Sequence, residues 1–225
     1  MNMNTKPKIA ILSKGFTLLE MMVVIMIIGI LSASLIVMVP EMLDKANITA
    51  NQKNMSNIYQ FMLQYRDDHS MSWPKDNGQR FFLRLWKDRY LDHTEKNAKM
   101  FFNPKAGPGS DLIFMPEGMS IEDYLNDWDS IGPEYTSYAG FNDGGDRSLR
   151  KRLARDPGHT AIVSDSELWH RTSMVYLTGD GATHKLLFPE LSEELGVELD
   201  ELLMDGAVLP GPGCVAEILA TVTND

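Results

Sequence analysis

An uninterrupted apolar segment near the N-terminus constrains this chain more than any other feature. Between Met21 and Pro40 there is no charged residue, and only Ser32 and Ser34 carry polar side chains. These 20 residues would extend about 30 Å as an α-helix, which is the thickness of the hydrocarbon core of a bilayer. The segment therefore predicts a helix that crosses a membrane.

The residues before this segment predict its orientation. Residues 1–14 contain Lys6, Lys8 and Lys14 but no acidic residue, and positive charge before the first apolar run holds that end in the cytoplasm. The run is longer than the core of about 7–15 residues in a secretory signal peptide, and no small-x-small cleavage pattern follows it. We therefore expect the apolar segment to remain in the protein as an anchor.

A cleavage point is expected before the anchor, at the Gly15–Phe16 bond, because glycine leaves the backbone open to a protease. Cleavage there would remove all three lysines and leave the apolar segment as a permanent anchor. The residues alone leave an uncleaved signal-anchor as the alternative.

Glu20 is a lone carboxylate at the edge of the apolar segment. A carboxylate inside a bilayer costs about 2.5–3.5 kcal/mol on insertion scales, so it is usually functional. Cleavage would create a positive amine on Phe16, and two poorly solvated opposite charges gain free energy by pairing within the chain or with a neighbour. Pairing between chains would fix the axial register of stacked helices. The alternative is that Glu20 only reaches the headgroups from the helix end.

The segment Lys14–Glu20, followed by the apolar run, resembles the N-terminus of type IV prepilins and type II secretion pseudoprepilins. The resemblance implies cleavage after Gly15 by prepilin peptidase, N-methylation of Phe16 and assembly into a helical filament. It gives Glu20 the role of the assembly carboxylate. Gly29 stands where the family usually has a glycine that loosens the helix.

We expect one helix from about Thr17 to about Arg66. No Gly or Pro occurs between Pro40 and Pro74, and Met55, Ile58, Met62 and Tyr65 recur at helical spacing. Pro40 is expected to kink the helix, because proline removes a hydrogen bond and clashes with the preceding turn. The prepilin family often has its proline at the position of Val37.

The predicted organisation is a leader (1–15), a transmembrane half of the helix (16–40), an amphipathic half (41–70) and a periplasmic head (71–225). The fold class expected for the whole is α+β and pilin-like, with the helix packed on a small antiparallel sheet. Helices are expected over Arg80–Leu91, after a capping Ser120, and from Pro189 toward Leu203. The segments rich in β-formers are Tyr135–Phe141, Thr160–Ser164, Thr172–Thr178 and Ala182–Phe188. Gly179, Asp180 and Gly181 predict a tight hairpin between the last two.

The exported part is acidic. Without Lys6, Lys8, Lys14 and Glu20, the totals of 21 basic and 31 acidic residues become 18 and 30, which gives residues 41–225 a net charge of −12. Such a domain is soluble and is not expected to bind nucleic acid. Cys214 is the single cysteine, so an internal disulfide and a zinc site built on paired cysteines are both excluded.

A second resemblance lies in the head. His170, then nine residues, then Asp180 and Gly181 resembles the C-terminal pattern of a large group of pseudopilin-like proteins, many from planctomycete and verrucomicrobial lineages. The segments Ser137–Phe141 and Phe101–Pro104 resemble the same group, which often has a cysteine at the position of Asn103. These motifs imply a family and do not identify a cargo.

Catalytic chemistry in the head is sparse. No His-x-x-x-His pair, Gly-x-Ser-x-Gly elbow or glycine-rich phosphate loop occurs. The fold could gather His159, His170 and His184 with Asp165 or Asp180 into a metal site, but polar histidines with local hydrogen bonds are the favoured interpretation.

The segment 142–146 gathers oxygen ligands around two glycines, which suits calcium, through Asn142, Asp143 and Asp146. Major type II pseudopilins have a calcium-bound loop, so the resemblance supports this site, whereas a plain Asx/Gly turn is the favoured alternative. No other cofactor is expected.

One basic cluster follows this turn. We interpret this cluster as a solvated face. The alternatives are that it binds an acidic neighbour in a filament or that it binds DNA. The cluster consists of Arg147, Arg150, Lys151, Arg152 and Arg155.

The sequence predicts a structural subunit, not an enzyme: a single-pass inner-membrane protein that packs into a type II secretion pseudopilus or a related filament. The expected partners are prepilin peptidase, other pseudopilins, and a secretion or pilus assembly platform. A type IV minor pilin is the alternative within this class. A membrane-tethered periplasmic enzyme or binding domain is the alternative outside it.

Overall fold

The computed structural model describes residues 16–110, 113–204 and 206–225. The chain divides into two compact units, Met1–Leu43 and Asp44–Asp225, and each is described by itself. The expected cleavage residue Gly15 lies outside the described residues.

The helix α1 (Leu18–Asp68) has 51 residues and contributes to both units. In the first unit its described side chains are exposed, and the helix is long and apolar enough to cross a membrane. This confirms the long N-terminal helix that the sequence predicts, with Pro40 inside it. The kink at Pro40 stays a prediction.

In the second unit, α1 buries one stripe of side chains at alternating spacings of four and three residues. This spacing places every member on one face of a helix. The stripe confirms the predicted positions 55, 58, 62 and 65 and extends them by about three turns toward the N-terminus, to Asp44. Its members are Asp44, Ile48, Asn51, Met55, Ile58, Met62 and Tyr65, each no more than 7% exposed.

The head is built on one antiparallel sheet with the strand order β4-β3-β2-β1-β5. The strands are β1 (Tyr138–Phe141), β2 (Ala161–Asp165), β3 (Ser173–Thr178), β4 (Thr183–Leu187) and β5 (Val222–Thr223). The four longer strands occupy the predicted β segments. The β3–β4 hairpin turns at Gly179–Gly181, where Gly181 has a φ of +92°. The α+β class with a small antiparallel sheet is therefore confirmed.

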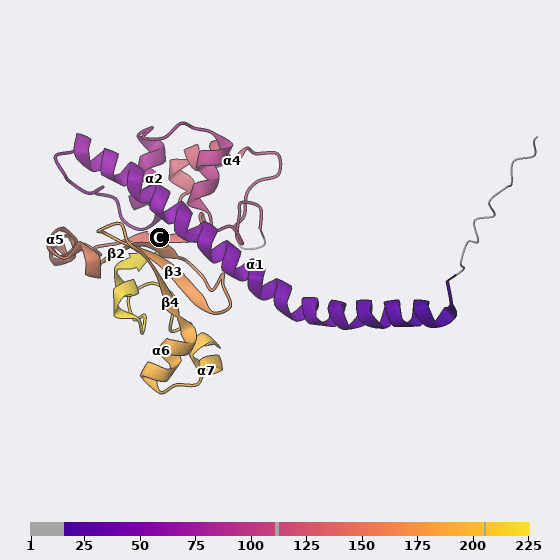
Figure 1. Ribbon diagram of the computed structural model, residues 1–225. Coiled ribbons are helices and arrows are strands. Elements are labelled where there is room, and N and C mark those ends of the chain that lie inside the picture. Colours follow the sequence, from indigo (N-terminus) through magenta and orange to yellow (C-terminus); the bar gives the residue numbers. More distant parts are fainter. Residues whose placement is uncertain (1–15, 111–112, 205) are drawn as a thin grey trace, which may run out of the picture. The chain divides into compact units, whose positions relative to one another are not determined.

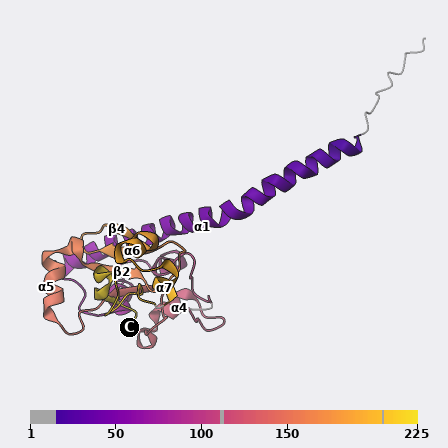
Figure 2. The same ribbon diagram turned by 90° about the horizontal axis from the view of Figure 1, so that it is seen from below.

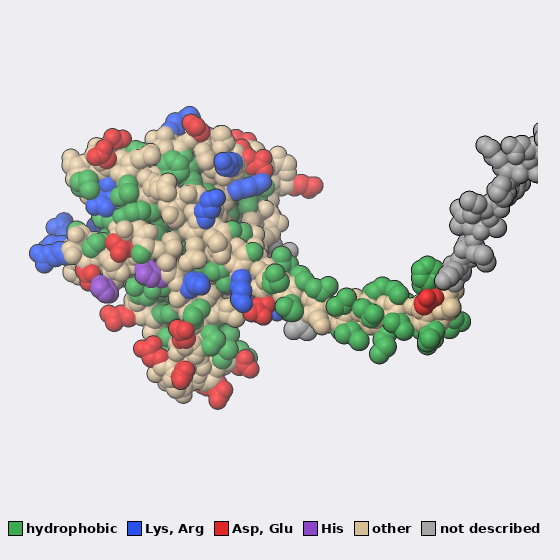
Figure 3. All heavy atoms as spheres, viewed as in Figure 1, with side chains coloured by type: hydrophobic (Ala, Val, Ile, Leu, Met, Phe, Trp, Pro, Cys, Tyr) green, Lys and Arg blue, Asp and Glu red, His purple; other side chains and the backbone are tan. Residues whose placement is uncertain are grey.

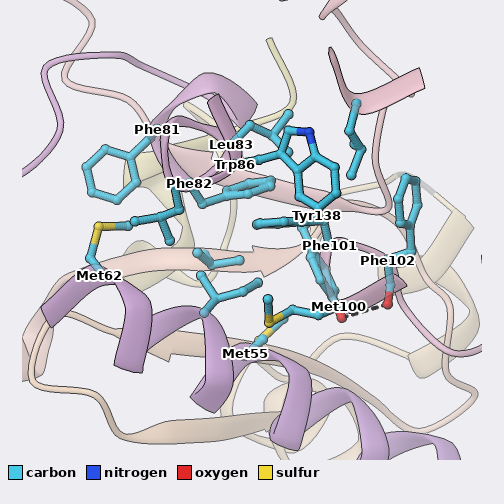
Figure 4. Close-up of a cluster of buried hydrophobic side chains, with 14 of the residues drawn as sticks. Met55, Met62, Phe81, Phe82, Leu83, Trp86, Met100, Phe101, Phe102 and Tyr138 are labelled. Carbon is cyan, nitrogen blue, oxygen red and sulfur yellow. Dashed lines mark hydrogen bonds between the residues drawn. The ribbon is translucent and has the colours of Figure 1, made fainter. Parts of the chain in front are cut away.

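Both faces of the sheet are covered, because β1, β2 and β3 are almost wholly buried. On one face, the stripe of α1 and the helix α2 (Gln79–Lys87) enclose an aromatic core (Figures 1 and 4). The helix expected over Arg80–Leu91 is α2, which ends at Lys87, and its aromatic side chains lie in this core, since Phe81, Phe82 and Trp86 are at most 1% exposed. On the other face, α6 (Phe188–Leu195) and α7 (Leu199–Met204) cover a smaller core around Phe188 and Leu202.

The remaining helices are short. Ser120 caps α4 (Ile121–Asn126) as predicted, accepting a hydrogen bond from the Asp123 N–H at 3.0 Å. The helix expected from Pro189 to Leu203 is two helices, because Gly196 adopts a left-handed conformation with a φ of +65° and ends α6. The other elements are α3 (Glu95–Ala98), η1 (Lys99–Phe101), α4 (Ile121–Asn126), η2 (Trp128–Ser130), α5 (Arg147–Arg155), η3 (Pro157–His159) and η4 (Glu217–Thr221).

Candidate functional site

At the start of α1, Thr17 and Glu20 form a capping box. The Thr17 N–H and the Thr17 hydroxyl donate to Glu20 Oε2 at 2.7 and 2.8 Å, and the Glu20 N–H donates to Thr17 Oγ1 at 3.2 Å. A threonine and a glutamate three residues apart satisfy each other's backbone donors in this way. The assembly carboxylate is thus held at the first turn of the apolar helix, next to the residue that cleavage would make the N-terminus.

The head contains a buried polar cluster where α1 crosses the sheet. Five segments distant in sequence supply it: α1, the loop after η1, the adjacent strands β1 and β2, and the loop before β3. Buried polar side chains need hydrogen-bond partners, so such a cluster fixes the elements that supply them. Its members are Asp44, Asn51, Asn103, Lys105, Tyr138, Asp165 and His170, and all except Lys105 are buried.

Asp165, the last residue of β2, lies at the centre of this polar cluster. Its Oδ1 accepts hydrogen bonds from Asn51 Nδ2 at 2.8 Å and Asn103 Nδ2 at 2.7 Å, and its Oδ2 accepts from the Val175 N–H at 2.8 Å. Burial raises the pKa of the Asp165 carboxyl to about 7, although these hydrogen bonds act to lower it. Donors from α1, the loop at Asn103 and β3 therefore converge on one carboxyl group.

His170 lies between Asp165 and a second carboxylate, Asp44. Its Nε2 is 3.1 Å from Asn103 Nδ2, and its Nδ1 is 3.4 Å from Asp44 Oδ1. Burial lowers the pKa of the His170 imidazole, and the nearby Asp44 carboxylate acts against that shift. The buried imidazole therefore connects Asn103 on one side with Asp44 on the other, away from solvent.

Asp44 forms one end of the cluster. It lies at the start of the part of α1 that belongs to the head. Its Oδ1 accepts a hydrogen bond from Lys105 Nζ at 2.9 Å, and its Oδ2 accepts one from the Arg171 N–H at 3.2 Å. Burial acts to raise the pKa of Asp44, but these donors outweigh it and hold the pKa below its usual value. Asp44 thereby ties α1 to two loops.

Tyr138 completes the cluster from β1. Its hydroxyl donates to Asn51 Oδ1 at 2.6 Å and lies 3.1 Å from the Phe102 carbonyl oxygen (Figure 4). Asn51 is therefore satisfied on both sides of its amide, by Asp165 as acceptor and by Tyr138 as donor. Burial raises the pKa of the Tyr138 hydroxyl well above its usual value, so the group acts as a donor.

The turn that contains Asp180 and Gly181 lies at the opposite end of β3 from His170, and it contacts α1 through Gly179, whose carbonyl oxygen accepts from the Tyr59 hydroxyl at 3.3 Å, and through Gly181. Asp180 Oδ1 accepts from Thr178 Oγ1 at 2.6 Å and closes the hairpin turn. A Cβ on Gly181 would lie 2.3 Å from the ring of Tyr59, so only glycine lets that ring lie against the turn. The three residues of the predicted head motif thus bracket β3, and each end of the strand holds α1, through Asn51 and Asp44 or through Tyr59.

The gathering of histidines that a metal site would need does not occur. His170 lies beside Asp165, but His184 stacks on Tyr176, and His159 pairs with Asp156 at 2.8 Å. In the part of the chain that the structure describes, no group of three His, Cys, Asp or Glu side chains could hold a metal ion.

The oxygens of the predicted calcium loop have protein partners. Asp143 pairs with Arg150 and accepts from Asn77 Nδ2 at 3.0 Å, while Asp146 caps α5 by accepting from the Ser148 N–H at 2.7 Å. The side-chain oxygen Oδ1 of Asn142 accepts from the Gly144 N–H at 2.8 Å. These contacts are those of an Asx turn that leads into a capped helix.

The sequence pointed to His170 and Asp180 as candidate site residues, but it did not single out Asp44, Asn51 or Tyr138. One pattern could have found two of them. Counting back from Met55 in steps of four and three residues leads to Asn51, Ile48 and Asp44, so the predicted apolar stripe contains two polar positions. A polar residue inside such a stripe sets the register of a helix.

The fold, a long N-terminal helix with a small antiparallel sheet, defines an α+β protein of pilin-like architecture. A family model described as the prokaryotic N-terminal methylation motif matches residues 12–36. The chain therefore carries this motif and fits a prepilin- or pseudopilin-type protein. No curated protein and no solved structure matches the chain. The His170–Asp180–Gly181 pattern stays a prediction as a family motif.

Proposed function

We propose that this protein is a structural subunit of a type II secretion pseudopilus or a related type IV pilus-like filament. The methylation motif over residues 12–36, on a helix long and apolar enough to cross a membrane, carries the proposal. The proteins that carry this motif are structural, and the motif supports both membrane anchoring and assembly with other pilins. A minor pilin is a variant of the same proposal.

Processing and assembly follow from the N-terminal half of α1. The leader stays in the cytoplasm, prepilin peptidase cuts after Gly15, and Phe16 is methylated. The capping box supports the role of Glu20, because it holds the carboxylate at the helix start, where the amine of a neighbouring chain would approach. In the bilayer, the attraction between that amine and Glu20 is weakly screened, so it would fix how far one stalk is shifted along the next.

The buried polar cluster supports a mechanical role for the head. Asp165 and His170 are at most 2% exposed, so a substrate could not reach them without unfolding the site. Asn51 and Asp44 hold α1 in one register on the sheet, because sliding the helix would leave buried polar groups without partners. A subunit that is pulled or pushed through its stalk needs this coupling between helix and head.

The test is in-membrane crosslinking between stalks of the full-length chain in cells with prepilin peptidase and an assembly platform. Ala33→Cys in a Cys214→Ala background reports contact between neighbouring α1 helices. We expect Glu20→Val to insert normally, because the cost of placing a carboxylate at the edge of the bilayer is removed. It should nonetheless lose most of the crosslinks, and Glu20→Asp should lose some of them.

Ser34→Val is the matched control, since it also removes a polar side chain from the apolar segment but leaves Glu20 in place. It should crosslink as the parent does. A membrane-tethered enzyme or binding domain would be indifferent to Glu20. Equal crosslinking and export by Glu20→Val and the parent would therefore contradict the filament proposal.

A further inference from the structure

The basic cluster of the sequence forms α5, a helix with one unpartnered face. Arg147, Lys151 and Arg155 follow each other at intervals of four residues and are exposed along one line of this helix. No hydrogen bond or ion pair joins the side chain of any of the three to another described residue. By contrast, Arg150 and Arg152 turn back to the head, where Arg150 pairs with Asp143. We call the first three the α5 stripe.

The region of α6 and α7 has the opposite character. Residues 188–204 contain six acidic residues and no lysine or arginine. All six are exposed, and within the described residues none of them has an ion pair or a side-chain hydrogen bond. They are Glu190, Glu193, Glu194, Glu198, Asp200 and Glu201, which we call the acidic lobe.

The α5 stripe and the acidic lobe lie on different parts of one head. Figures 1 and 2 separate α5 from α6 and α7, and Figure 3 shows blue side chains gathered at the α5 edge and red ones over the lobe. No described ion pair connects the two surfaces. Among the described residues, the head therefore presents two surfaces of opposite charge whose side chains form no ion pairs with each other.

We infer that the α5 stripe docks on the acidic lobe of a second copy of this chain. Three aligned cations match a surface of six unpaired carboxylates, and Leu195 and Met204, which are 42% and 85% exposed, add apolar area to the lobe. In the proposed filament each copy gives its stripe to one neighbour and its lobe to another, so the contact is heterologous and each added copy leaves one free stripe and one free lobe. Such a contact propagates as an open filament.

The charge of the whole head favours a protein partner over a polyanion. Residues 41–225 carry a net charge of −12, which repels nucleic acid and anionic lipid, whereas the acidic lobe of another copy presents carboxylates at a matching local density. The inference rests on the proposed filament function and adds to it the head surfaces that meet.

The experiment uses two full-length chains, both with Cys214→Ala, expressed together in cells with the assembly platform. One carries Ala154→Cys on α5 and the other carries Leu195→Cys on α6, both at exposed uncharged positions. Since each chain has a single cysteine, a disulfide between positions 154 and 195 can form only between copies. We expect this crosslink to form, and a crosslink between two 154 positions to be absent because like charges oppose each other there.

Charge reversal then tests the complementarity. Arg147→Glu, Lys151→Glu and Arg155→Glu together should reduce the 154–195 crosslink about tenfold, since each exposed pair contributes a small factor. Glu194→Lys, Glu198→Lys and Glu201→Lys in the other chain should restore it. Raising the salt concentration from about 0.1 M to 1 M should weaken the parent crosslink, because the Debye length falls to about 3 Å.

The stalk crosslink at position 33 separates the two proposals. If stalk crosslinks form but the 154–195 crosslink is absent or indifferent to charge reversal, the head contact is wrong and the filament proposal stands. If stalk crosslinks are absent in the parent, the filament proposal itself fails. Loss of sedimentation with anionic vesicles on reversal of the α5 stripe, with 154–195 crosslinking unchanged, would assign the stripe to lipid and overturn the inference.

Discussion

Asp165 is a carboxyl group that the fold removes entirely from water, and its position explains the rest of the polar cluster. Three donors converge on its two oxygens, from Asn51, Asn103 and Val175. Its pKa of about 7 lies above that of an exposed aspartate because burial disfavours the charged form. Ionisation of one residue is therefore coupled to how firmly α1 is held.

The pH dependence of stability should identify Asp165. A pKa raised from 3.8 to about 7 means that the folded head binds a proton more tightly than the unfolded chain does. This stabilisation is fully present below about pH 4 and is lost as the pH rises through 7, by roughly 4 kcal/mol. Asp165→Asn should lower stability at low pH, yet flatten the slope between pH 4 and 7, as measured by thermal unfolding of the full chain in detergent.

Asp180→Asn is the control for this experiment. Hydrogen bonds from Thr178 and Ala182 hold the pKa of Asp180 below its usual value, so its contribution to the slope is confined to pH values below about 5 and is absent between pH 5 and 7. The control should keep the slope of the parent. A parent-like slope in Asp165→Asn would contradict the assignment. The lowered pKa of His170 contributes a slope of opposite sign, which both variants share.

At the scale of elements, α1 is held in place near both ends of β3. His170 and Asp165 hold Asp44 and Asn51 at one end, and the turn at Gly181 holds Tyr59 at the other. Asn51 and Tyr59 lie eight residues apart on α1, or about 12 Å along the helix. Two anchors at this separation fix both the axial position and the rotation of the helix.

The Gly181 anchor can be tested by adding one methyl group. Gly181→Ala should destabilise the head by roughly 2–4 kcal/mol, because its Cβ would lie 2.3 Å from the Tyr59 ring and its φ is +92°. Gly144→Ala is the matched control, since Gly144 has a φ of +55° with nothing within 4 Å of the added Cβ. It should show only the backbone cost of about 1–2 kcal/mol.

A double-mutant cycle then isolates the contact. In a Tyr59→Ala background the ring is gone, so the additional cost of Gly181→Ala should fall to that of the Gly144 control. Denaturant unfolding of the four chains measures the coupling. An unchanged cost in the Tyr59→Ala background would show that Gly181 is required by the turn and not by α1.

The Asn142–Asp146 turn makes a prediction about calcium. Its carboxylates already pair with Arg150, Asn77 and Ser148, so we expect 1 mM calcium to shift the melting temperature by no more than about 1 °C relative to chelator. A site with a dissociation constant of about 10 µM would add about 2.7 kcal/mol at this concentration. A shift of several degrees would contradict the turn and favour the calcium loop of the type II pseudopilins.

At the scale of the whole molecule, the protein is an anchor and a head that share one helix. The described side chains in the apolar half of α1 are exposed, whereas the stripe on the other half is buried in the core of the head. Anchoring, processing and assembly therefore depend on the first half, and the second half connects them to the surface that the head presents.

Processing should depend on the absence of a side chain at position 15. Gly15→Val should block prepilin peptidase, because a branched side chain obstructs the approach to the backbone, while insertion depends on the unchanged apolar segment. The product should remain 15 residues heavier than the processed parent and still sediment with membranes. Intact-mass analysis of membranes decides, and normal trimming of the variant would contradict the predicted cleavage site.

The sequence by itself determined the anchor, the class and most of the elements, because these depend on local information. Twenty uncharged residues fix a membrane-length helix, and the step of four and three residues fixes its buried stripe. Four β-rich segments separated by turn residues predicted the four longer strands, since alternation and turn chemistry act over a few residues. The helix α5 was missed because arginine and lysine carry no apolar periodicity.

Only the tertiary structure decided what the polar residues do. The spacing of the stripe marks Asn51 as a buried position but does not reveal its partners, and Asp165 becomes special only when Asn51, Asn103 and Val175 reach it from distant segments. Similarly, the sequence identifies Gly181 only as a turn residue, and the structure adds that the Tyr59 ring lies against it. Hydrogen bonds and steric contacts between segments depend on which surfaces meet, and that is a property of the packed chain rather than of any stretch of it.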